Sequence, residues 1–343
     1  MKALVLHQAN APFELTDVPD PVAGPGEAVA RVYACGSGLT IQHFKAGRIP
    51  TVFPRIIGHE ICAEIVAVGA DVSRLQVGDI VTSYFYINCG HCKMCRTNRE
   101  PLCENLGGYV GREIDGGYAE YIKLPERLFI KLPDSLVWQD QPAHVGVAMD
   151  ALATPFKVLR RARIKPGENV AVFGAGGGLG IHQLMMAKWA DARVIAVDTK
   201  SSKFDACREA GADEVVDASN GNVVEALMDL TRGKGVDVSI DYVSNKVTLE
   251  AGVRALGKHG RFVTLGGAGD SFSVDAAHLL NNEIDVLGSR YVTPQEILET
   301  YDLMARGEVW PVVTEIRPME EAEIIHEMVE NGEVTGRAAL LIG

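Results

Sequence analysis

The sequence lacks several features that would place it in whole classes of protein. No apolar stretch among its 343 residues reaches the length that a membrane-spanning helix needs, and residues 1–6 do not form a cleavable leader. An excess of positive charge is also missing, because the formal net charge is −12, which argues against nucleic acid and anionic membrane surfaces as partners. Tandem repeats are absent too. These absences predict a cytoplasmic enzyme that acts on a small molecule.

Cysteine is scarce, and its distribution is informative. Of seven cysteines, four fall close together at Cys89, Cys92, Cys95 and Cys103. Four thiolates on one compact loop suit tetrahedral zinc, and four protein ligands leave no position open for a substrate. A disulfide framework is disfavoured in a chain without a secretory leader. The spacing therefore predicts one structural zinc ion per chain, which stabilises a lobe and takes no part in catalysis.

The length allows two domains, and the pattern of apolar runs, glycines and prolines changes near residue 165. Before that point, Gly and Pro separate short apolar runs, which predicts a β-rich, barrel-like domain with strands at 28–33, 62–68, 79–82 and 118–123. After it, strands alternate with helices, which predicts a doubly wound parallel sheet covered on both faces. We assign strands to 170–173, 194–197, 236–241 and 262–265, and helices to 180–190, 203–210 and 248–256.

Beyond residue 288 the pattern predicts helices at 294–306 and 320–329 and a last strand at 338–342. We expect this segment to return to the first domain. The predicted domains are therefore 1–150, completed by 290–343, and a dinucleotide-binding domain at 151–289.

A glycine-rich turn follows the strand at 170–173 and precedes a helix. Gly174, Gly177 and Gly180 let the backbone approach a pyrophosphate, and the helix N-terminus supplies free N–H groups. The next strand ends at Asp198, whose carboxylate would accept hydrogen bonds from the ribose hydroxyls and repel a 2′-phosphate. Lys203 either lies along the adenine or is a surface lysine. The sequence predicts NAD rather than NADP.

The cysteine lobe and the dinucleotide half together resemble the zinc-type medium-chain dehydrogenase/reductase family, which includes the zinc alcohol dehydrogenases. Gly58-His59-Glu60 is similar to the family's GHE motif, residues 115–120 to its DGGYAEY turn, and residues 332–338 to its closing segment. The resemblance covers nearly the whole chain and implies a GroES-like β-barrel domain plus a Rossmann domain. It also implies that Arg337 reaches the cofactor pyrophosphate. The other cofactor contacts that it implies are Thr154, Gly178, Leu179, Val243, Gly266 and Ser289.

The chain departs from the family where a catalytic zinc would bind. The resemblance implies a cysteine, a histidine and a second cysteine or acid as ligands, but Gly38 stands at the first cysteine and Asp150 at the last ligand. Ile41 replaces an aspartate of the outer shell. His59 and Asp150, with or without Glu60, would bind zinc weakly because no thiolate is present.

A slip in register could bring Cys35 into the ligand position, but it would place Ser37 and Thr40 in the relay positions and leave no histidine there, so it is disfavoured. We predict that a second, catalytic zinc is not tightly bound.

The proton path of the family is retained. Thr40 and His43 match its hydroxyl–imidazole relay, in which a proton passes from the substrate oxygen through the ribose to histidine. His59, Glu60 or Asp150 would serve as acid/base or electrostatic partner, and Phe85 would line the pocket.

We therefore predict an NAD-dependent oxidoreductase that interconverts a secondary or cyclic alcohol and a ketone or aldehyde. One alternative is an NAD(P)H-dependent enoyl or enone reductase, since members without catalytic zinc often reduce C=C bonds. Another is a non-catalytic NAD-binding regulatory protein. The resemblance further implies a homotetramer, or a homodimer, with the strand at 284–288 pairing across a two-fold axis.

Overall fold

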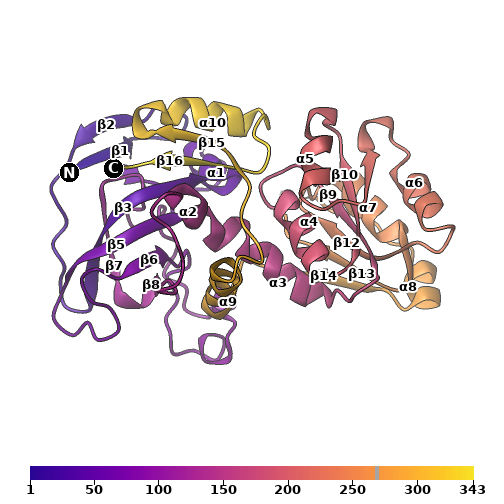
Figure 1. Ribbon diagram of the computed structural model, residues 1–343, viewed down its shortest axis with the longest axis horizontal. Coiled ribbons are helices and arrows are strands. Elements are labelled where there is room, and N and C mark those ends of the chain that lie inside the picture. Colours follow the sequence, from indigo (N-terminus) through magenta and orange to yellow (C-terminus); the bar gives the residue numbers. More distant parts are fainter. Residues whose placement is uncertain (267–269) are drawn as a thin grey trace. The chain divides into compact units, whose positions relative to one another are not determined.

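The computed structural model describes residues 1–266 and 270–343, which form two compact units. Unit 1 comprises Met1–Ala153 and Val292–Gly343, and unit 2 comprises Thr154–Tyr291. Unit 1 is rich in strands, whereas unit 2 alternates strands and helices (Figure 1). The predicted fold class, a GroES-like β domain plus a Rossmann domain, is confirmed. None of the helices in the described ranges is long and apolar enough to cross a membrane.

Unit 1 is built around the long strand β3. Its strands are β1 (Lys2–Leu6), β2 (Glu14–Asp17), β3 (Glu27–Ser37), β4 (Arg55–Ile56), β5 (Ile61–Val68), β6 (Ile80–Ser83), β7 (Tyr121–Pro125), β8 (Phe129–Lys131), β15 (Val313–Pro318) and β16 (Arg337–Leu341). Its helices are α1 (Leu39–Lys45), α2 (Pro142–Ala151), α9 (Pro294–Ala305) and α10 (Ala322–Glu330), with 3-10 turns η1 (Cys95–Thr97), η2 (Glu100–Leu102), η3 (Glu126–Leu128) and η6 (Met319–Glu321).

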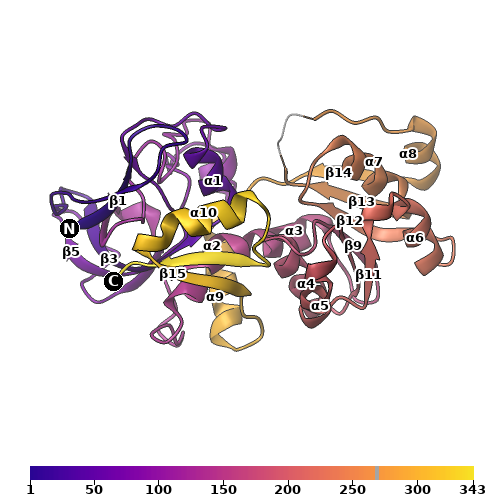
Figure 2. The ribbon, with the colours of Figure 1, turned by 90° about the horizontal axis from the view of Figure 1, so that it is seen from above.

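The strands of unit 1 bring the two ends of the sequence together. Among the described residues, β2-β1-β4 form one sheet and β15-β16-β3-β5-β6-β8 form another, with β7 also on β3. Strand β16 is antiparallel to β3, with Ala338 opposite Ser37. Figure 2 shows α10 lying along β15, close to the strands of the N-terminal segment. This register brings the start of β16 beside the residues that follow β3.

Unit 2 has one parallel sheet with helices on its faces. Its strands are β9 (Asn169–Phe173), β10 (Arg193–Asp198), β11 (Glu214–Asp217), β12 (Val236–Asp241), β13 (Leu256–Thr264) and β14 (Asp285–Gly288). Its helices are α3 (Ala153–Ala162), α4 (Gly180–Trp189), α5 (Phe204–Glu209), α6 (Val223–Leu230), α7 (Lys246–Arg254) and α8 (Ala276–Asn282), with 3-10 turns η4 (Ser201–Lys203) and η5 (Ala218–Asn220). Helix α3 begins at Ala153, the last residue of unit 1 before the division.

The strand order of unit 2 is β11-β10-β9-β12-β13-β14, the doubly wound order that reverses direction between β9 and β12. Side chains of β9 alternate between two cores: Val170 and Val172 pack with Leu184 of α4, and Ala171 and Phe173 pack with residues of the other face. Both faces of the sheet are therefore buried, as parallel sheets require.

Some element bounds differ from the predicted ones. The strand predicted at 118–123 is β7 at Tyr121–Pro125, and the helix predicted at 248–256 ends at Arg254. Strand β13 already begins at Leu256, because the Gly-rich start of this strand reads as a turn in sequence, and its pairing with β12 is irregular there. Several further elements were not predicted, among them β11, α3, α6 and α8 of unit 2 and β1, β2 and β15 of unit 1.

Candidate functional site

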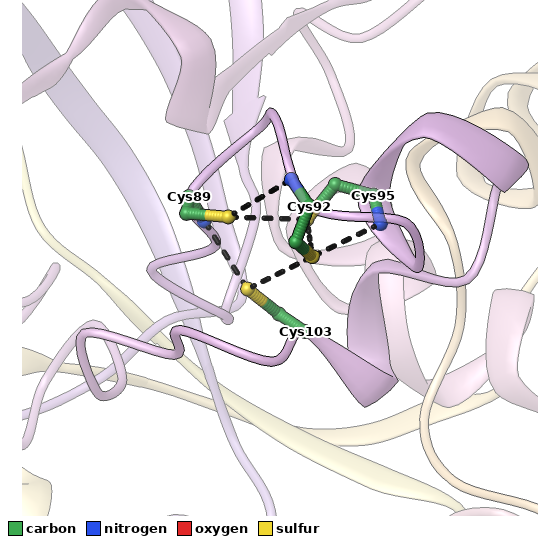
Figure 3. Close-up of side chains that lie close together, drawn as sticks. All are labelled: Cys89, Cys92, Cys95 and Cys103. Carbon is green, nitrogen blue, oxygen red and sulfur yellow. Dashed lines mark hydrogen bonds between the residues drawn. The ribbon is translucent and has the colours of Figure 1, made fainter.

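The four clustered cysteines lie on the loop between β6 and β7, around η1 and η2 (Figure 3). The Sγ atoms of Cys92 and Cys95 are 3.5 Å apart, those of Cys92 and Cys103 are 3.9 Å apart, and those of Cys89 and Cys95 are 4.0 Å apart. Tetrahedral zinc with Zn–S bonds of about 2.3 Å needs sulfurs about 3.8 Å apart. The four thiols therefore converge at the spacing that a zinc ion requires.

Backbone N–H groups also point at these sulfurs. The amide of Cys92 donates to Sγ of Cys89 at 3.4 Å, and the amide of Cys89 donates to Sγ of Cys103 at 3.3 Å. Backbone amides that donate to Sγ of Cys89, with that of His91 having the largest effect, lower the pKa of the Cys89 thiol to about 6. They favour the thiolate, which is the form that binds metal. The donor set and its surroundings fit a closed, structural zinc site.

A second cluster of ionisable groups is buried in unit 1. It contains His59 and Glu60, which precede β5, Asp150 near the end of α2, and Arg337 at the start of β16. All four side chains are buried, and the ligand atoms of His59, Glu60 and Asp150 lie within 4.8 Å of one another. The structure therefore brings together three predicted catalytic residues, and places Arg337 with them.

Arg337 connects the two acids of this cluster. Its Nε donates to Glu60 Oε2 at 3.0 Å, its terminal NH2 group forms a short hydrogen bond with Glu60 Oε1, and the same group donates to Asp150 Oδ2 at 3.0 Å. Burial raises the pKa of Glu60 to about 7, against the lowering effect of Arg337 and with a smaller raising effect of Asp150. In this structure the arginine assigned by resemblance to the cofactor is part of an ion cluster with two carboxylates.

Two glycines at the end of β3 make room for this cluster. A Cβ at Gly38 would lie 2.6 Å from Cζ of Arg337, and a Cβ at Gly36 would collide with the carboxylate of Glu60. Real Cβ atoms do not approach other atoms so closely, because protein interiors are already close-packed. The guanidinium thus lies where a side chain at position 38 would point.

His59 is buried beside the acids and is neutral. Its Nε2 lies 4.0 Å from Asp150 Oδ2, and the ring of Phe85 lies against it, tilted by 30°, at a centroid distance of 4.1 Å. Burial lowers the pKa of His59 to about 4, because Asp150 only partly offsets the loss of water. Phe85 is therefore a direct neighbour of a predicted catalytic residue.

Thr40 and His43 lie three residues apart on α1, hence on one face of the helix. His43 is half-buried, and its Nδ1 accepts a hydrogen bond of 2.8 Å from Nε of Arg48. Glu330 holds the guanidinium of Arg48. Neither Arg48 nor Glu330 was predicted. Arg48 is beyond the end of α1, outside its helical period, and Glu330 is separated from it by 282 residues, so no local pattern indicates either one.

In unit 2 the glycine turn lies between β9 and α4, as predicted for a phosphate-binding turn. Gly174 has a φ of +72°, and a Cβ at Gly180 would overlap the carbonyl oxygen of Gly174. Asp198 at the end of β10 accepts hydrogen bonds from the amide of Gly176 at 2.8 Å and from the amide of Lys200 at 3.0 Å. The carboxylate is thus fixed against the turn, where it can meet a ribose.

Apart from Thr154, which lies in α3, the remaining predicted cofactor residues of unit 2 lie around this turn or follow the ends of neighbouring strands. Lys203 is buried, and a Cβ at Gly176 would lie 2.7 Å from its Cβ, so the interpretation of Lys203 as a surface lysine is wrong. A Cβ at Gly174 would likewise lie too close to the side chain of Val243.

Gly266 packs against Ser244, the amide of Ser289 donates to the carbonyl of Thr264, and Thr154 is buried in α3. Gly177, Gly178 and Leu179 complete the turn before α4. The glycine turn, with Val243 and Asp198 beside it, follows the carboxyl ends of β9, β12 and β10, which is where doubly wound sheets bind nucleotides.

Known proteins resemble this chain over its whole length. The family models "Alcohol dehydrogenase GroES-like domain" and "Zinc-binding dehydrogenase" match residues 24–134 and 178–306. An alcohol dehydrogenase of Geobacillus stearothermophilus is 33% identical, with 99% of this chain and 98% of the relative aligned. An NAD-dependent alcohol dehydrogenase of Sulfurisphaera tokodaii is 30% identical over 99% and 100%. The crystal structure of the Aeropyrum pernix alcohol dehydrogenase superposes with a TM-score of 0.90 at 32% identity, covering 99% of this chain and 100% of that one.

Proposed function

This chain belongs to the zinc-type medium-chain dehydrogenase/reductase family that includes the alcohol dehydrogenases, and from that premise we propose that it is an NAD-dependent oxidoreductase working without a tightly bound catalytic zinc. Its substrate is a secondary or cyclic alcohol, or the matching ketone or aldehyde. One structural zinc ion is held by Cys89, Cys92, Cys95 and Cys103.

The observation that supports this proposal is the position of Arg337. Its guanidinium lies where a side chain at position 38 would point, and it pairs with Glu60 and Asp150. A zinc site with three protein ligands there would need Glu60 as well as His59 and Asp150, but both oxygens of Glu60 are held by the buried guanidinium. Leaving a buried charge unpaired costs about 3–5 kcal/mol. The donors that remain include one histidine and no thiolate. The residues present do not fit a catalytic zinc, so no step is assigned to one.

NAD would be held by the turn at Gly174, Gly177 and Gly180 and by Asp198, and when bound it supplies the acceptor for the hydride of the alcohol carbon. The protein's own groups handle the proton. The Thr40 hydroxyl hydrogen-bonds the substrate oxygen, and His43 is the terminal acceptor of the proton that leaves it. Arg337 provides the fixed positive charge of the buried cluster, and Glu60, with a pKa of about 7, can hold or release a proton near neutrality.

We also propose that the chain forms a homo-oligomer, a homotetramer or a homodimer. Strand β14 pairs with β13 on one side and, among the described residues, with no strand on the other. Its Val286 is 42% exposed. An edge strand of this kind can pair with its copy across a two-fold axis.

Metal analysis together with a substrate survey tests the proposed function. We expect one zinc per chain, and oxidation of secondary or cyclic alcohols with NAD that persists in a His59→Asn variant at the same zinc content, at a reduced rate. Two firmly bound zinc ions, the second removed only with loss of turnover, would overturn the zinc-free site. Turnover of enones alone would indicate a C=C reductase, and NAD binding without any turnover a regulatory protein.

A further inference from the structure

The chain folds back on His43 directly after α1. Gly47 has a φ of +69°, in the left-handed region that favours glycine, and the amides of Arg48 and Ile49 both donate to the carbonyl of His43 at 3.0 and 3.3 Å. A side chain at position 47 would also meet Ala9, because a Cβ there would lie 2.6 Å from the Ala9 Cβ. This turn returns the side chain of Arg48 to the ring of His43.

The hydrogen bond between the two side chains has a defined direction. A guanidinium is protonated at all relevant pH values and can only donate, so Nε of Arg48 is the donor and Nδ1 of His43 the acceptor. The neutral ring then carries its hydrogen on Nε2. Protonation of Nδ1 would remove this bond and place an imidazolium against a guanidinium.

Glu330 fixes the guanidinium in this position. Its two carboxylate oxygens accept from the NH1 and NH2 groups of Arg48 at 2.6 and 2.5 Å, a bidentate pair. Gln42 donates to the same carboxylate at 2.8 Å through Nε2. Arg48 bridges α1 and α10 through this acid.

A buried chain of hydrogen bonds anchors Gln42 in turn. Gln42 Oε1 lies 2.6 Å from Nδ1 of His326, and Nε2 of His326 lies 3.0 Å from the hydroxyl of Tyr118, which contacts Ser37 at 2.5 Å. An amide oxygen only accepts, so Nδ1 of His326 carries the hydrogen. Burial lowers the pKa of His326 to about 3, and the ring stays neutral at working pH. The position of Glu330 is therefore set from the core of unit 1.

We propose that Arg48, held by Glu330, is a positioning residue for the proton relay: it fixes the tautomer of His43 and keeps the ring unprotonated so that it is ready to accept a proton. This inference depends on the role of His43 in the proposed function. The charges facing the ring are Arg48 from the turn and Glu330 from α10, while Lys45 of the same helix is paired with Glu323. Burial and Arg48 lower the pKa of His43, and Glu330 opposes them.

The consequence is a relay that works in more acidic solution than an ordinary histidine would allow. A base must be unprotonated to accept a proton, so alcohol oxidation declines when the pH falls below the pKa of His43. Without Arg48 this pKa rises, and the decline begins at a higher pH. Because Arg48 and Glu330 have side chains that are 43% and 40% exposed, their replacement should leave the fold intact.

The experiment is nitrogen-15 NMR of the histidine rings in the zinc-loaded full-length protein, with the His43 signals assigned by their loss in His43→Asn. We expect Nδ1 to be unprotonated and hydrogen-bonded in the parent protein. In Arg48→Met the ring should titrate at higher pH, and the acid limb of kcat/KM for alcohol oxidation should move the same way. Arg48→Lys keeps the positive charge but not the planar guanidinium, so its His43 ring should titrate at a pH between those of the parent protein and Arg48→Met. Glu330→Gln should weaken the preference for the tautomer that carries its hydrogen on Nε2.

The control is Arg74→Met, which breaks an ion pair between an exposed arginine and Glu126 elsewhere in unit 1 and should change neither readout. An unchanged tautomer and titration of His43 in both Arg48→Met and Glu330→Gln would overturn the inference. The spectra do not depend on turnover, so a His43 that responds to Arg48 but whose replacement leaves oxidation unchanged would refute the relay while retaining the contact.

Discussion

The guanidinium of Arg337 occupies the space that a side chain at position 38 would need, with Cζ 2.6 Å from the position of the absent Cβ. This relationship links a glycine at the end of β3 to an arginine at the start of β16. It arises from the register of the two strands, in which Ala338 is opposite Ser37. Position 38 and position 337 have therefore to be considered together.

Gly38→Ala should destabilise the protein by about 1–3 kcal/mol, because the added methyl group forces the guanidinium away from its acids. Urea unfolding would measure the change in the free energy of unfolding. Gly343→Ala is the control, since a Cβ there would meet only Nη2 of Arg31, at 3.9 Å, and it should cost less than about 0.5 kcal/mol. Gly38→Cys should leave the zinc content at one per chain, and a gain of zinc would contradict the account of this site.

The Arg337–Glu60 pair should show strong coupling in a double-mutant cycle. Arg337→Gln leaves two buried carboxylates without their partner and should cost about 3–5 kcal/mol. Adding Glu60→Gln should recover much of that loss, because one uncompensated charge is removed. The exposed pair Arg48 and Glu330, with side chains 43% and 40% exposed, offers a comparison, with coupling expected below about 1 kcal/mol. Additive effects of the two buried substitutions would show that the ion pair contributes little.

Replacement of one lobe cysteine should remove the structural zinc. Cys92→Ser should lower the zinc content towards zero and the midpoint of thermal unfolding with it, since four ligands hold the ion. His91→Ala is a suitable control, because this exposed histidine lies in the same loop and hydrogen-bonds the carbonyl of Cys89 without being a predicted ligand. A Cys92→Ser protein that keeps its zinc would exclude the four-cysteine site.

Cofactor preference should depend on Asp198. Asp198→Asn removes the negative charge and keeps an oxygen that can accept from the amide of Gly176. The ratio of kcat/KM for NAD to that for NADP should fall at least tenfold, a change of about 1.4 kcal/mol, because the repulsion of a 2′-phosphate is lost. The same ratio measured in Asp205→Asn, an exposed acid nearby in sequence, should not change. An unaltered preference in Asp198→Asn would place the discrimination elsewhere.

Stability should decrease in acid partly because of His326. Its pKa is about 3 in the folded protein, whereas a histidine in the unfolded chain has a pKa near 6.5. Between these values the unfolded chain binds the extra proton, so stability is complete above about pH 6.5 and is lost as the pH falls towards 3, by up to about 1.4 kcal/mol per pH unit.

His326→Asn keeps a donor for Gln42 but does not titrate there, so its urea stability between pH 6 and pH 4 should change less steeply than that of the parent protein. Other acid-sensitive groups, including His59 and the cysteine lobe, are common to both proteins and cancel in the difference. Equal slopes would mean that His326 does not remain neutral on folding.

Features that depend on residues close together in the sequence could be predicted, whereas features that depend on residues far apart in the sequence could not. The fold class followed from the alternation of strands and helices and was confirmed. The spacing of Cys89 to Cys103 predicts a cluster, and the structure brings the four sulfurs together. A local spacing fixes which residues share a loop, so the inference needs no knowledge of the tertiary fold.

Arg337 shows the limit of such reasoning. Its partner Glu60 is 277 residues away, and only the pairing of β16 with β3 brings them together. The resemblance assigned it to the cofactor, and nothing in the residues around it indicates a bond to two acids. Likewise, the sequence shows that position 38 is not a cysteine, but it does not show that Arg337 occupies the space beside it. The start of β13 was predicted wrongly because the glycines at the beginning of this strand are typical of a turn.

The place of β16 has a consequence for synthesis on the ribosome. Unit 2 is one continuous segment, whereas unit 1 needs residues that are translated after unit 2 is complete. Because Arg337 is among these late residues, Glu60 and Asp150 emerge long before the cation that neutralises them. The nascent chain therefore carries both acids before the arginine that pairs with them is made, and this ion cluster can form only after the last strand has been translated.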